Sequence, residues 1–535
     1  MGEVFGIDLG TTYSAVAKIG DDDQPVVVNN AEGDSTTPSV VFFEDGGNIV
    51  VGRQAKSELI IKPDDGQALI KRDMGNDLRL DFFGNTYTPE SLSALILKEL
   101  VQAANAEGNT DISKAVITVP AYFGVREKEA TKQAGEIAGL DVVGILAEPI
   151  AAALSVGVRG ERKETLLVYD LGGGTFDTTV MIAEPGNVEV VAVDGNRVLG
   201  GADWDTTLAQ LVVDRFREKT GISDNPSEDT EFMVELLKEI EKAKIALTRL
   251  VSTKVLCKYQ DYKENVQVTR EDFESATKHL IDQTVEITER TIATAQGIKP
   301  GLEIDKLILV GGSSRMPMVE NALRAMGWDP EKTEFDLAVA KGAAIYGEAL
   351  LIGAVPFPAP GGGSRDGDSA EAVPENTVER PFLGGAATLN IKNVLSRGIG
   401  VKFVKNDRTQ TEYIGFLVHA NDSLPIVDCT LEAFTAADGQ TSVSIELYEQ
   451  AGEVESEEVS SNKLLKESEI SGLPSLPQGS PIHLLLNVSN EGLIRLSARE
   501  PQSGQFLEME AQVSLLSKEE VDKAKIIVSG LMTKS

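Results

Sequence analysis

The chain contains two matching hairpins in which an aspartate near the end of an apolar run is followed by a glycine turn and a threonine. The first reads FGIDLGTTYSAVA and carries Asp8, and the second reads LLVYDLGGGTFDTTVMI and carries Asp170 in the matching place. A carboxylate in an apolar strand is costly to bury unless something binds it. The repeat therefore predicts two similar lobes that face each other across a ligand cleft.

Turns of this composition can cradle phosphate groups. Glycine lets the backbone turn tightly and approach a ligand, successive N–H groups form an anion-binding concavity, and threonine hydroxyls add donors. A carboxylate beside phosphates would repel them, and a hydrated Mg²⁺ between the two removes that conflict. The alternative is a pair of ordinary structural hairpins, which the second matched copy disfavours.

A third glycine-rich turn follows the apolar strand predicted at Leu307–Val310. It reads VGGSSR and runs from Val310 to Arg315. Glycines at the mouth of a helix suit a flat ring or a phosphate that lies against the backbone. No G-x-x-x-x-G-K-[ST] motif occurs, and no G-x-G-x-x-G follows a strand in a dinucleotide-binding context. The glycine turns therefore belong to neither of those phosphate sites.

A strong helical pattern over Glu235–Leu250 places Glu241, Lys244 and Thr248 on one face. These side chains suit a ribose and an adenine edge, although the pattern alone favours a solvated surface. Lys71 follows an apolar run and, taken alone, is one lysine among many.

The composition limits the classes of function. The 535 residues are 41% hydrophobic and 25% charged, which predicts two to four globular domains. The formal net charge of -34 argues against nucleic acid and anionic membranes as main partners, and it also keeps a protein soluble. Two distant cysteines and three scattered histidines predict neither a disulfide framework nor a zinc site. No signal peptide and no membrane-spanning run are evident, so a reducing cytoplasm is the expected location.

The elements that must position these residues fall into two unequal parts. Strands alternate with helices over 1–354, including a helix predicted at Arg126–Leu140, and this alternation indicates an α/β architecture. A stretch rich in Pro, Gly and charge is assigned to a flexible linker over 355–388. Short β-type runs separated by turn residues over 389–514 indicate a compact antiparallel sandwich.

The last segment, 515–535, predicts a short helix. Ser517 and Glu520 have the spacing of a capping box, and the helix is expected to end near Gly530.

Eight segments occur in the order typical of one family: GIDLGTTYS, AVITVPAYF, ILAEPIAAAL, VYDLGGGTFD, LGGADWD, EKAKIALT, ILVGGSSRMP and DLAVAKGAA. Together they resemble the 70-kDa heat-shock chaperone family, and the resemblance covers the chain to about residue 354. It implies a multidomain protein, in which an actin-like ATPase domain has two lobes and a duplicated ribonuclease H-like core. A β-sandwich peptide-binding domain, to which the resemblance is weaker, and a short helix follow.

The resemblance also implies an ATP-dependent chaperone that binds ATP or ADP with Mg²⁺, and K⁺ as a further ion. It places Asp8 and Asp170 at the metal. The residues that it implies for hydrolysis are Lys71, Glu148, Asp170, Thr175 and Asp177. The nucleotide contacts that it implies are Gly10, Thr11, Thr12, Tyr13, Gly172, Gly173, Gly174, Gly200, Gly201, Ala202, Glu241, Lys244, Thr248, Gly311, Gly312, Ser313, Arg315 and Asp336.

In the sandwich, the resemblance implies a pocket for extended apolar segments of unfolded polypeptides. Its residues would be Ile399, Val401, Phe434, Val443 and Ile445, each of which is equally compatible with plain sandwich core. A J-domain co-chaperone and a nucleotide-exchange factor are further partners that the resemblance implies, whereas nucleic acid and membrane are not.

Three features depart from the family pattern. The linker is long and polar, with only LNIKNVLS apolar; the helical lid is reduced to one short helix; and Lys128 stands where an arginine is usual after Pro120. These departures leave the coupling of ATP hydrolysis to peptide release open. Two alternatives also stay open: an ATP-holding co-chaperone of the exchange-factor type with weak or no peptide cycling, and a small-molecule kinase of the same fold.

Overall fold

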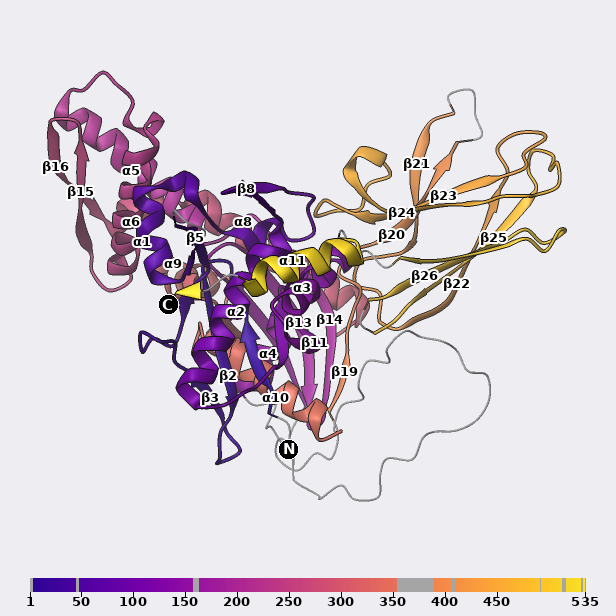
Figure 1. The fold of residues 1–535 in the computed structure, drawn as a ribbon, viewed down its shortest axis with the longest axis horizontal. Helices are drawn as coiled ribbons and strands as arrows, with labels where there is room; N and C mark the ends of the chain where they lie inside the picture. Colours follow the sequence, from indigo (N-terminus) through magenta and orange to yellow (C-terminus); the bar gives the residue numbers. More distant parts are fainter. Residues whose placement is uncertain are drawn as a thin grey trace.

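The computed structural model describes residues 3–44, 48–156, 163–353, 389–405, 410–490, 492–511, 516–530 and 533–534. The linker predicted over 355–388 lies outside these residues. A two-lobed α/β body carries a β-sandwich that projects from one side (Figure 1). None of the helices described is long and apolar enough to cross a membrane.

The first lobe is built on a sheet with the strand order β11-β10-β1-β2-β3. Three consecutive strands form an antiparallel meander, and two later strands add in parallel to β1. The strands are β1 (Phe5–Asp8), β2 (Tyr13–Ile19), β3 (Pro25–Val28), β10 (Lys114–Val119) and β11 (Asp141–Ala147).

The second lobe repeats this arrangement with the order β18-β17-β12-β13-β14. Again an antiparallel meander comes first and two later strands run parallel to its first strand. The strands are β12 (Glu164–Leu171), β13 (Phe176–Glu184), β14 (Asn187–Asn196), β17 (Lys306–Val310) and β18 (Glu331–Lys332). The predicted duplicated α/β core is therefore confirmed.

Helices cover the two sheets, because strands with buried residues on both faces need apolar cover on each side. The helices α4 and α10 pack together near the junction of the lobes, and α2 and α3 pack on the first lobe. The predicted helix Arg126–Leu140 is confirmed as α3, which ends three residues earlier. The helices of the body are α1 (Arg53–Ile61), α2 (Pro89–Gly108), α3 (Val125–Ile137), α4 (Glu148–Val156), α5 (Gly201–Thr220), α6 (Thr230–Leu247), α7 (Arg270–Ala276), α8 (Lys278–Ile298), α9 (Pro317–Ala325) and α10 (Ala338–Leu351).

Small sheets and single turns complete the outer parts of the lobes. The remaining strands of the body are β4 (Thr37–Pro38), β5 (Val40–Phe43), β6 (Ile49–Val51), β7 (Gly66–Ala68), β8 (Leu80–Phe82), β9 (Asn85–Tyr87), β15 (Ser252–Tyr259) and β16 (Tyr262–Thr269). The short 3₁₀ turn η2 (Ile70–Asp73) carries Lys71 toward the cleft.

The C-terminal part is an antiparallel sandwich with the sheet orders β21-β20-β23-β24 and β22-β25-β26-β27. Its core holds the alternate residues of both inner faces, including the fully buried Leu447, Leu486 and Ile494. The strands are β20 (Ile399–Val404), β21 (Glu412–Val418), β22 (Ile426–Phe434), β23 (Val443–Gln450), β24 (Asn462–Ile470), β25 (Pro481–Val488), β26 (Ile494–Arg499) and β27 (Phe506–Ala511).

Two C-terminal segments lie against the α/β body. The strand β19 (Asn390–Lys392) pairs in parallel with β14 and so extends the sheet of the second lobe. The helix α11 (Lys518–Gly530) packs on α2 and α3, and its Val521 and Val528 join the core of the first lobe (Figure 1). The capping box is confirmed, since Ser517 Oγ accepts from Glu520 N at 3.3 Å and Glu520 Oε2 accepts from Ser517 N at 2.8 Å. Beyond α11, β28 (Thr533–Lys534) pairs with β6.

Candidate functional site

The two glycine turns meet where the lobes face each other. The first turn joins β1 to β2 and the second joins β12 to β13. A Cβ atom added to Gly173 would overlap the side chain of Thr12, and one added to Gly174 would overlap that of Thr11. Only glycine allows so close an approach, so the spacing of the glycines is explained by the contact between lobes.

Five ionisable side chains converge beside these turns: Asp8, Lys71, Glu148, Asp170 and Asp177. Lys71 Nζ lies 2.5 Å from Glu148 Oε1, and both side chains are more than nine-tenths buried. Thr118 Oγ1 donates to Asp8 Oδ1 at 3.3 Å. The cluster draws on β1, β12, β13, α4 and η2, so the fold brings together residues that are far apart in the sequence.

Burial controls the proton affinity of this cluster. Burial raises the pKa of Asp8 to about 7, Glu148 adds to the effect, and Lys71 opposes it. Burial and then Glu148 also hold the pKa of Asp170 and of Asp177 well above the ordinary value. Burial works against the charge on Lys71, but Glu148 and Asp8 outweigh it and the pKa of Lys71 is raised. The site therefore holds one lysine that stays protonated. The buried carboxylates beside it would be stabilised in their ionised form by a further bound cation.

The cluster suits a hydrated divalent cation. Asp177 Oδ1 accepts from Tyr122 N at 3.4 Å, whereas the buried Asp177 Oδ2 has no hydrogen-bond partner within the described chain. Among the described residues, no group of three or more His, Cys, Asp or Glu side chains is placed to hold a metal directly. Crowded carboxylates with raised pKa and an unpartnered oxygen instead fit Mg²⁺ that keeps several waters.

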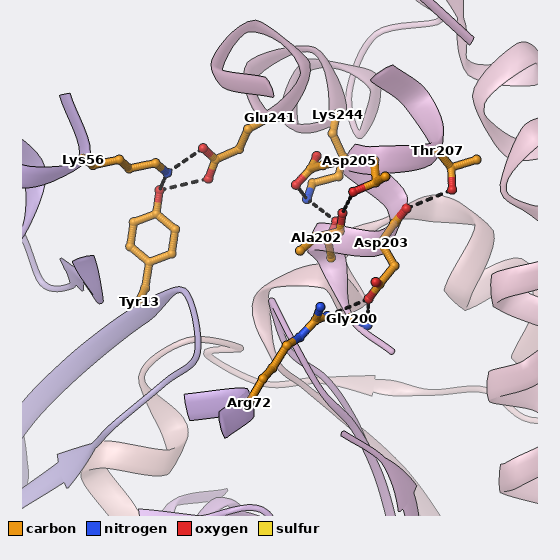
Figure 2. Close-up of polar contacts among 12 residues, drawn as sticks. Tyr13, Lys56, Arg72, Gly200, Ala202, Asp203, Asp205, Thr207, Glu241 and Lys244 are labelled. Carbon is orange, nitrogen blue, oxygen red and sulfur yellow. Dashed lines mark hydrogen bonds and ion pairs between the residues drawn. The ribbon is translucent and has the colours of Figure 1, made fainter. Parts of the chain in front are cut away.

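The second glycine turn is held from both lobes. Arg72 Nη2 lies 2.6 Å from Asp203 Oδ2 (Figure 2). Arg72 Nε also donates to Gly174 O at 2.9 Å. Asp203 Oδ2 also accepts from Gly200 N at 2.7 Å, at the start of α5. The backbone N–H of Ala202 donates to Gly173 O at 2.8 Å. The glycine pair before α5 is thus fixed beside the turn after β12.

The helix α6 supplies two charged residues to the cleft, each with its own partner. Glu241 Oε2 lies 2.5 Å from Lys56 Nζ, and Glu241 Oε1 accepts from Tyr13 Oη at 3.1 Å (Figure 2). Lys244 Nζ lies 2.6 Å from Asp205 Oδ2. These contacts reverse the interpretation of this face as solvated surface. The predicted Thr248 lies at the C-cap of α6, where its hydroxyl donates to the carbonyl of Ile245 at 2.7 Å.

The third glycine turn directly follows β17 in the second lobe. Gly311 has φ 82° and sits against Asp170 and Leu171, so a side chain there would be both strained and blocked. Arg315 Nη2 lies 2.6 Å from Asp336 Oδ2, and the guanidinium lies 4.5 Å from the centre of the Phe335 ring. The half-exposed Arg315 presents a flat cationic surface that suits a planar base.

Gly312 and Ser313 bring the third glycine turn close to Asp336 and to the start of α5. A Cβ atom on Gly312 would lie 2.6 Å from Asp336 Oδ1, and one on Gly201 would overlap Ser313 Oγ. The structure thus brings the three glycine turns and the start of α5 around one cleft. The exposed hydroxyl of Thr248, engaged with its own helix, is the predicted contact least tied to this cleft.

The five residues predicted for a peptide pocket fall into two groups in the structure, in the core of the sandwich and on its surface. Ile399, Val401 and Ile445 are buried in the sandwich core, and Val443 packs against it. Phe434 ends β22 in the other sheet with 59% of its surface exposed. The alternative of plain core fits the first three, and the pocket stays a prediction.

Polar contacts join the sandwich to the α/β body. Val125 N donates to Glu449 Oε1 at 3.0 Å, and Arg397 Nη1 donates to Glu127 Oε1 at 3.3 Å. Both glutamates have 1% of their side chain exposed. Ser396 Oγ donates to Phe123 O at 2.8 Å. The segment after Pro120 therefore touches Asp177 of the cleft through Tyr122 and the sandwich through the residues that follow.

The pKa values of the two glutamates at this contact shift in opposite directions. Charge interactions therefore contribute to the contact between the sandwich and the body. Burial raises the pKa of Glu449, and Glu127 adds to it. Burial opposes the charge on Glu127, but Arg397 and Lys463 outweigh it and its pKa is lowered. Lys128, which differs from the family pattern, has its pKa lowered by burial although Glu449 and Glu127 oppose this.

Sequence reasoning missed the partners that hold the site. No role is assigned to Arg72, Asp203, Asp205 or Lys56 from the sequence, although Arg72 directly follows Lys71 and the two aspartates lie in the quoted segment LGGADWD. Only the pairing of distant side chains reveals them.

Comparison with known proteins agrees with this architecture. A family model described as Hsp70 protein matches residues 4–82, 76–355 and 388–533. Two curated relatives, each named Chaperone protein DnaK and found in two strains of Halobacterium salinarum, are 36% identical over 512 residues. The alignment covers 94% of this chain and 74% of each relative. With an actin-like two-lobed body, a β-sandwich and a family match over most of its length, the chain belongs to the Hsp70 family of ATP-dependent chaperones.

Proposed function

We propose that this chain hydrolyses Mg-ATP to ADP and phosphate in the cleft and uses the two nucleotide states to control binding of extended apolar segments of unfolded polypeptides. The observation that carries the proposal is the buried Lys71–Glu148 pair, which lies beside Asp170 and Asp177. Phosphoryl transfer to water needs positioning and charge neutralisation more than covalent chemistry, and these residues supply both.

Each residue has a distinct part in this proposal. Asp8 and Asp170 would hold the hydrated Mg²⁺, which neutralises phosphate charge when bound. Lys71 stays protonated because of its carboxylate neighbours, and its ammonium group stabilises charge on the terminal phosphate. Glu148 fixes Lys71 through a 2.5 Å contact. Asp177, whose Oδ2 has no hydrogen-bond partner among the described residues, would accept a hydrogen bond from the attacking water.

The segment from Pro120 to Glu127 would carry the nucleotide state to the sandwich. Its Tyr122 N contacts Asp177, its Val125 N contacts Glu449, and its Glu127 contacts Arg397. A change in hydrogen bonding at Asp177 would therefore be transmitted to the contact with the sandwich through one continuous stretch of chain. A J-domain co-chaperone and a nucleotide-exchange factor, which regulate such a cycle, are the proposed protein partners.

The test measures steady-state and single-turnover ATP hydrolysis with and without an unfolded apolar peptide, and peptide affinity with ATP, with ADP and without nucleotide. The proposal predicts Mg²⁺-dependent hydrolysis that peptide stimulates and peptide affinity that differs between ATP and ADP. A Lys71→Ala variant that still binds ATP serves as the control for contaminating ATPase. ATP binding with no turnover and no peptide binding in any state would instead identify a nucleotide-holding co-chaperone.

A further inference from the structure

Two buried serines close a ring of hydrogen bonds around the first glycine turn. Gly10 N donates to Ser14 Oγ at 3.1 Å, Ser14 Oγ lies 2.9 Å from Ser39 Oγ, and Ser39 Oγ donates to Gly10 O at 2.7 Å. Ser14 and Ser39 are 1% and 2% exposed. Ser39 lies 25 residues beyond Ser14 and reaches the turn because β4 pairs with the start of β2.

The donor and the acceptor of each hydrogen bond in the ring follow from the number of protons that each group carries. A carbonyl oxygen only accepts, so Ser39 must give its single hydroxyl proton to Gly10 O. The contact between the serines is then a donation from Ser14 to Ser39, and Ser14 keeps a lone pair for Gly10 N. All three donors point the same way around the ring, an arrangement in which each hydrogen bond polarises and strengthens the next.

A fourth contact ties the same residue to the other end of the turn. Ser39 N donates to Thr12 O at 2.9 Å. The ring and this bond use the N–H of Gly10 and the carbonyls of Gly10 and Thr12. Within the described part of the chain, the N–H groups of Thr11 and Thr12 have no protein acceptor, so they stay available to an anion. At Gly10, a Cβ atom would overlap the carbonyl oxygen of Tyr13, which shows how tight the turn is.

We propose that Ser39 is a positioning residue for the nucleotide phosphates: through the ring with Ser14 and Gly10 it holds the first glycine turn in the shape in which its N–H groups meet a phosphate. This inference rests on the proposed ATP site and adds a residue that touches no reacting atom. The second glycine turn has no such ring in the described chain and is held by Arg72 instead.

Ser39→Ala removes the hydroxyl that donates to Gly10 O and leaves the Ser14 hydroxyl without its acceptor. An unsatisfied buried polar group of this kind weakens the ordered state of the turn enough to lower phosphate affinity about tenfold, or about 1.4 kcal/mol. Adenosine has no phosphate to meet the turn, so its affinity is expected to change by less than about twofold. A general loss of structure would instead weaken ATP and adenosine equally.

The experiment titrates ATP, ADP and adenosine into the full chain by calorimetry, for wild type, Ser39→Ala, Ser39→Thr and Ser14→Ala. Selective loss of ATP and ADP affinity in Ser39→Ala and in Ser14→Ala, with recovery in the hydroxyl-bearing Ser39→Thr, supports the inference. Ser93→Ala is the matched control, because Ser93 is a buried serine of the same lobe, 1% exposed, whose hydroxyl contacts Met74 Sδ at 3.5 Å away from the turn.

Two results would overturn the inference. One is an unchanged ATP affinity in both alanine variants, and the other is an equal loss of ATP and adenosine affinity. Ser14→Ala keeps the test decisive if Ser39→Ala does not fold, since it breaks the same ring from the opposite side. Wild-type protein that binds adenosine and no ATP would contradict the proposed function itself, a result separate from any difference between variants.

Discussion

Arg72 and Asp203 join the two lobes across the cleft, with Arg72 Nη2 2.6 Å from Asp203 Oδ2. The two residues are 131 positions apart, and the same guanidinium also donates to Gly174 O. The contact holds the two lobes together, so it is expected to slow release of a nucleotide from the site proposed between them.

Arg72→Met is accordingly expected to increase the rate of ADP release about five- to tenfold, since a half-buried charge-assisted pair contributes about 1 kcal/mol or more. Displacement of a fluorescent ADP analogue by stopped flow measures this rate. Arg79→Met is the matched control, because the ion pairs of Arg79 within the described chain, with Asp77 and Glu520, are exposed. An equal effect of both substitutions would contradict a specific role for the Arg72–Asp203 contact.

Replacing the cation of the cleft should separate binding from hydrolysis. Lys71→Met removes the charge that pairs with Glu148 and that faces the phosphates in the proposed site. We expect single-turnover hydrolysis to fall at least about a hundredfold, as for other groups that stabilise developing charge. ATP affinity is expected to change far less, since the glycine turns and Mg²⁺ remain. Thermal unfolding of the variant controls for the buried Glu148 that loses its partner. Hydrolysis within about tenfold of wild type would remove Lys71 from the mechanism.

The raised pKa of Asp8, about 7, predicts a pH dependence of metal binding. Below that pH the side chain holds a proton in the nucleotide-free protein, and a metal that needs the carboxylate must displace it. Affinity for Mg²⁺ in the presence of ADP should therefore rise as the pH increases from about 6 to about 8, with proton release on binding. Calorimetry in buffers of different ionisation enthalpy counts the protons. Asp8→Asn should lower the number of protons released without abolishing the pH dependence, because burial also raises the pKa of Asp170 and of Asp177. A proton count near zero in wild type would refute the assignment.

Removing Arg397 should weaken the contact between the sandwich and the α/β body. Arg397→Met removes one cation beside the buried Glu127 and Glu449, while Arg197 and Lys463 stay 3.6 and 3.9 Å from Glu127 Oε1. The cost is therefore expected to be below the about 3–5 kcal/mol of a buried charge left without any partner. We expect a larger radius of gyration by small-angle X-ray scattering and loss of peptide-stimulated hydrolysis.

A control within the sandwich is Lys402→Met, because the ion pairs of Lys402 among the described residues are with Glu412 and Glu446, both on sandwich strands. The double variant Arg397→Met, Glu127→Gln should regain part of the compact form, since it removes the charge of one of the two glutamates that Arg397 contacts. An unchanged radius in Arg397→Met would show that the contact is not electrostatic.

Two predicted pocket residues should respond differently to truncation. Ile445 is 3% exposed in the sandwich core, so Ile445→Ala should cost about 2–5 kcal/mol of unfolding free energy. Phe434 is exposed, and Phe434→Ala should leave stability within about 0.5 kcal/mol while lowering peptide affinity if the side chain contacts peptide. Denaturant unfolding and fluorescence anisotropy of a labelled peptide measure the two effects. Equal peptide affinity in wild type and Phe434→Ala would exclude Phe434 from the pocket.

Local patterns predicted much of the α/β body correctly. The helix α3, the strand β17 and the capping box of α11 follow from periodicity and turn chemistry, which act over a few residues. The pocket residues could not be resolved in this way, because an apolar residue in a strand has the same pattern whether it packs in a core or meets a ligand.

The sequence by itself determined the two glycine turns and their duplication, because a tight backbone approach requires glycine and each hairpin is a contiguous stretch. Only the tertiary structure decided which side chains hold those turns. Lys56 and Glu241 are 185 positions apart, and Ser39 and Gly10 are 29 positions apart. Pairs like these depend on where the folded chain directs each side chain. No local pattern encodes that direction, because it is set by the packing of the two lobes and the sandwich.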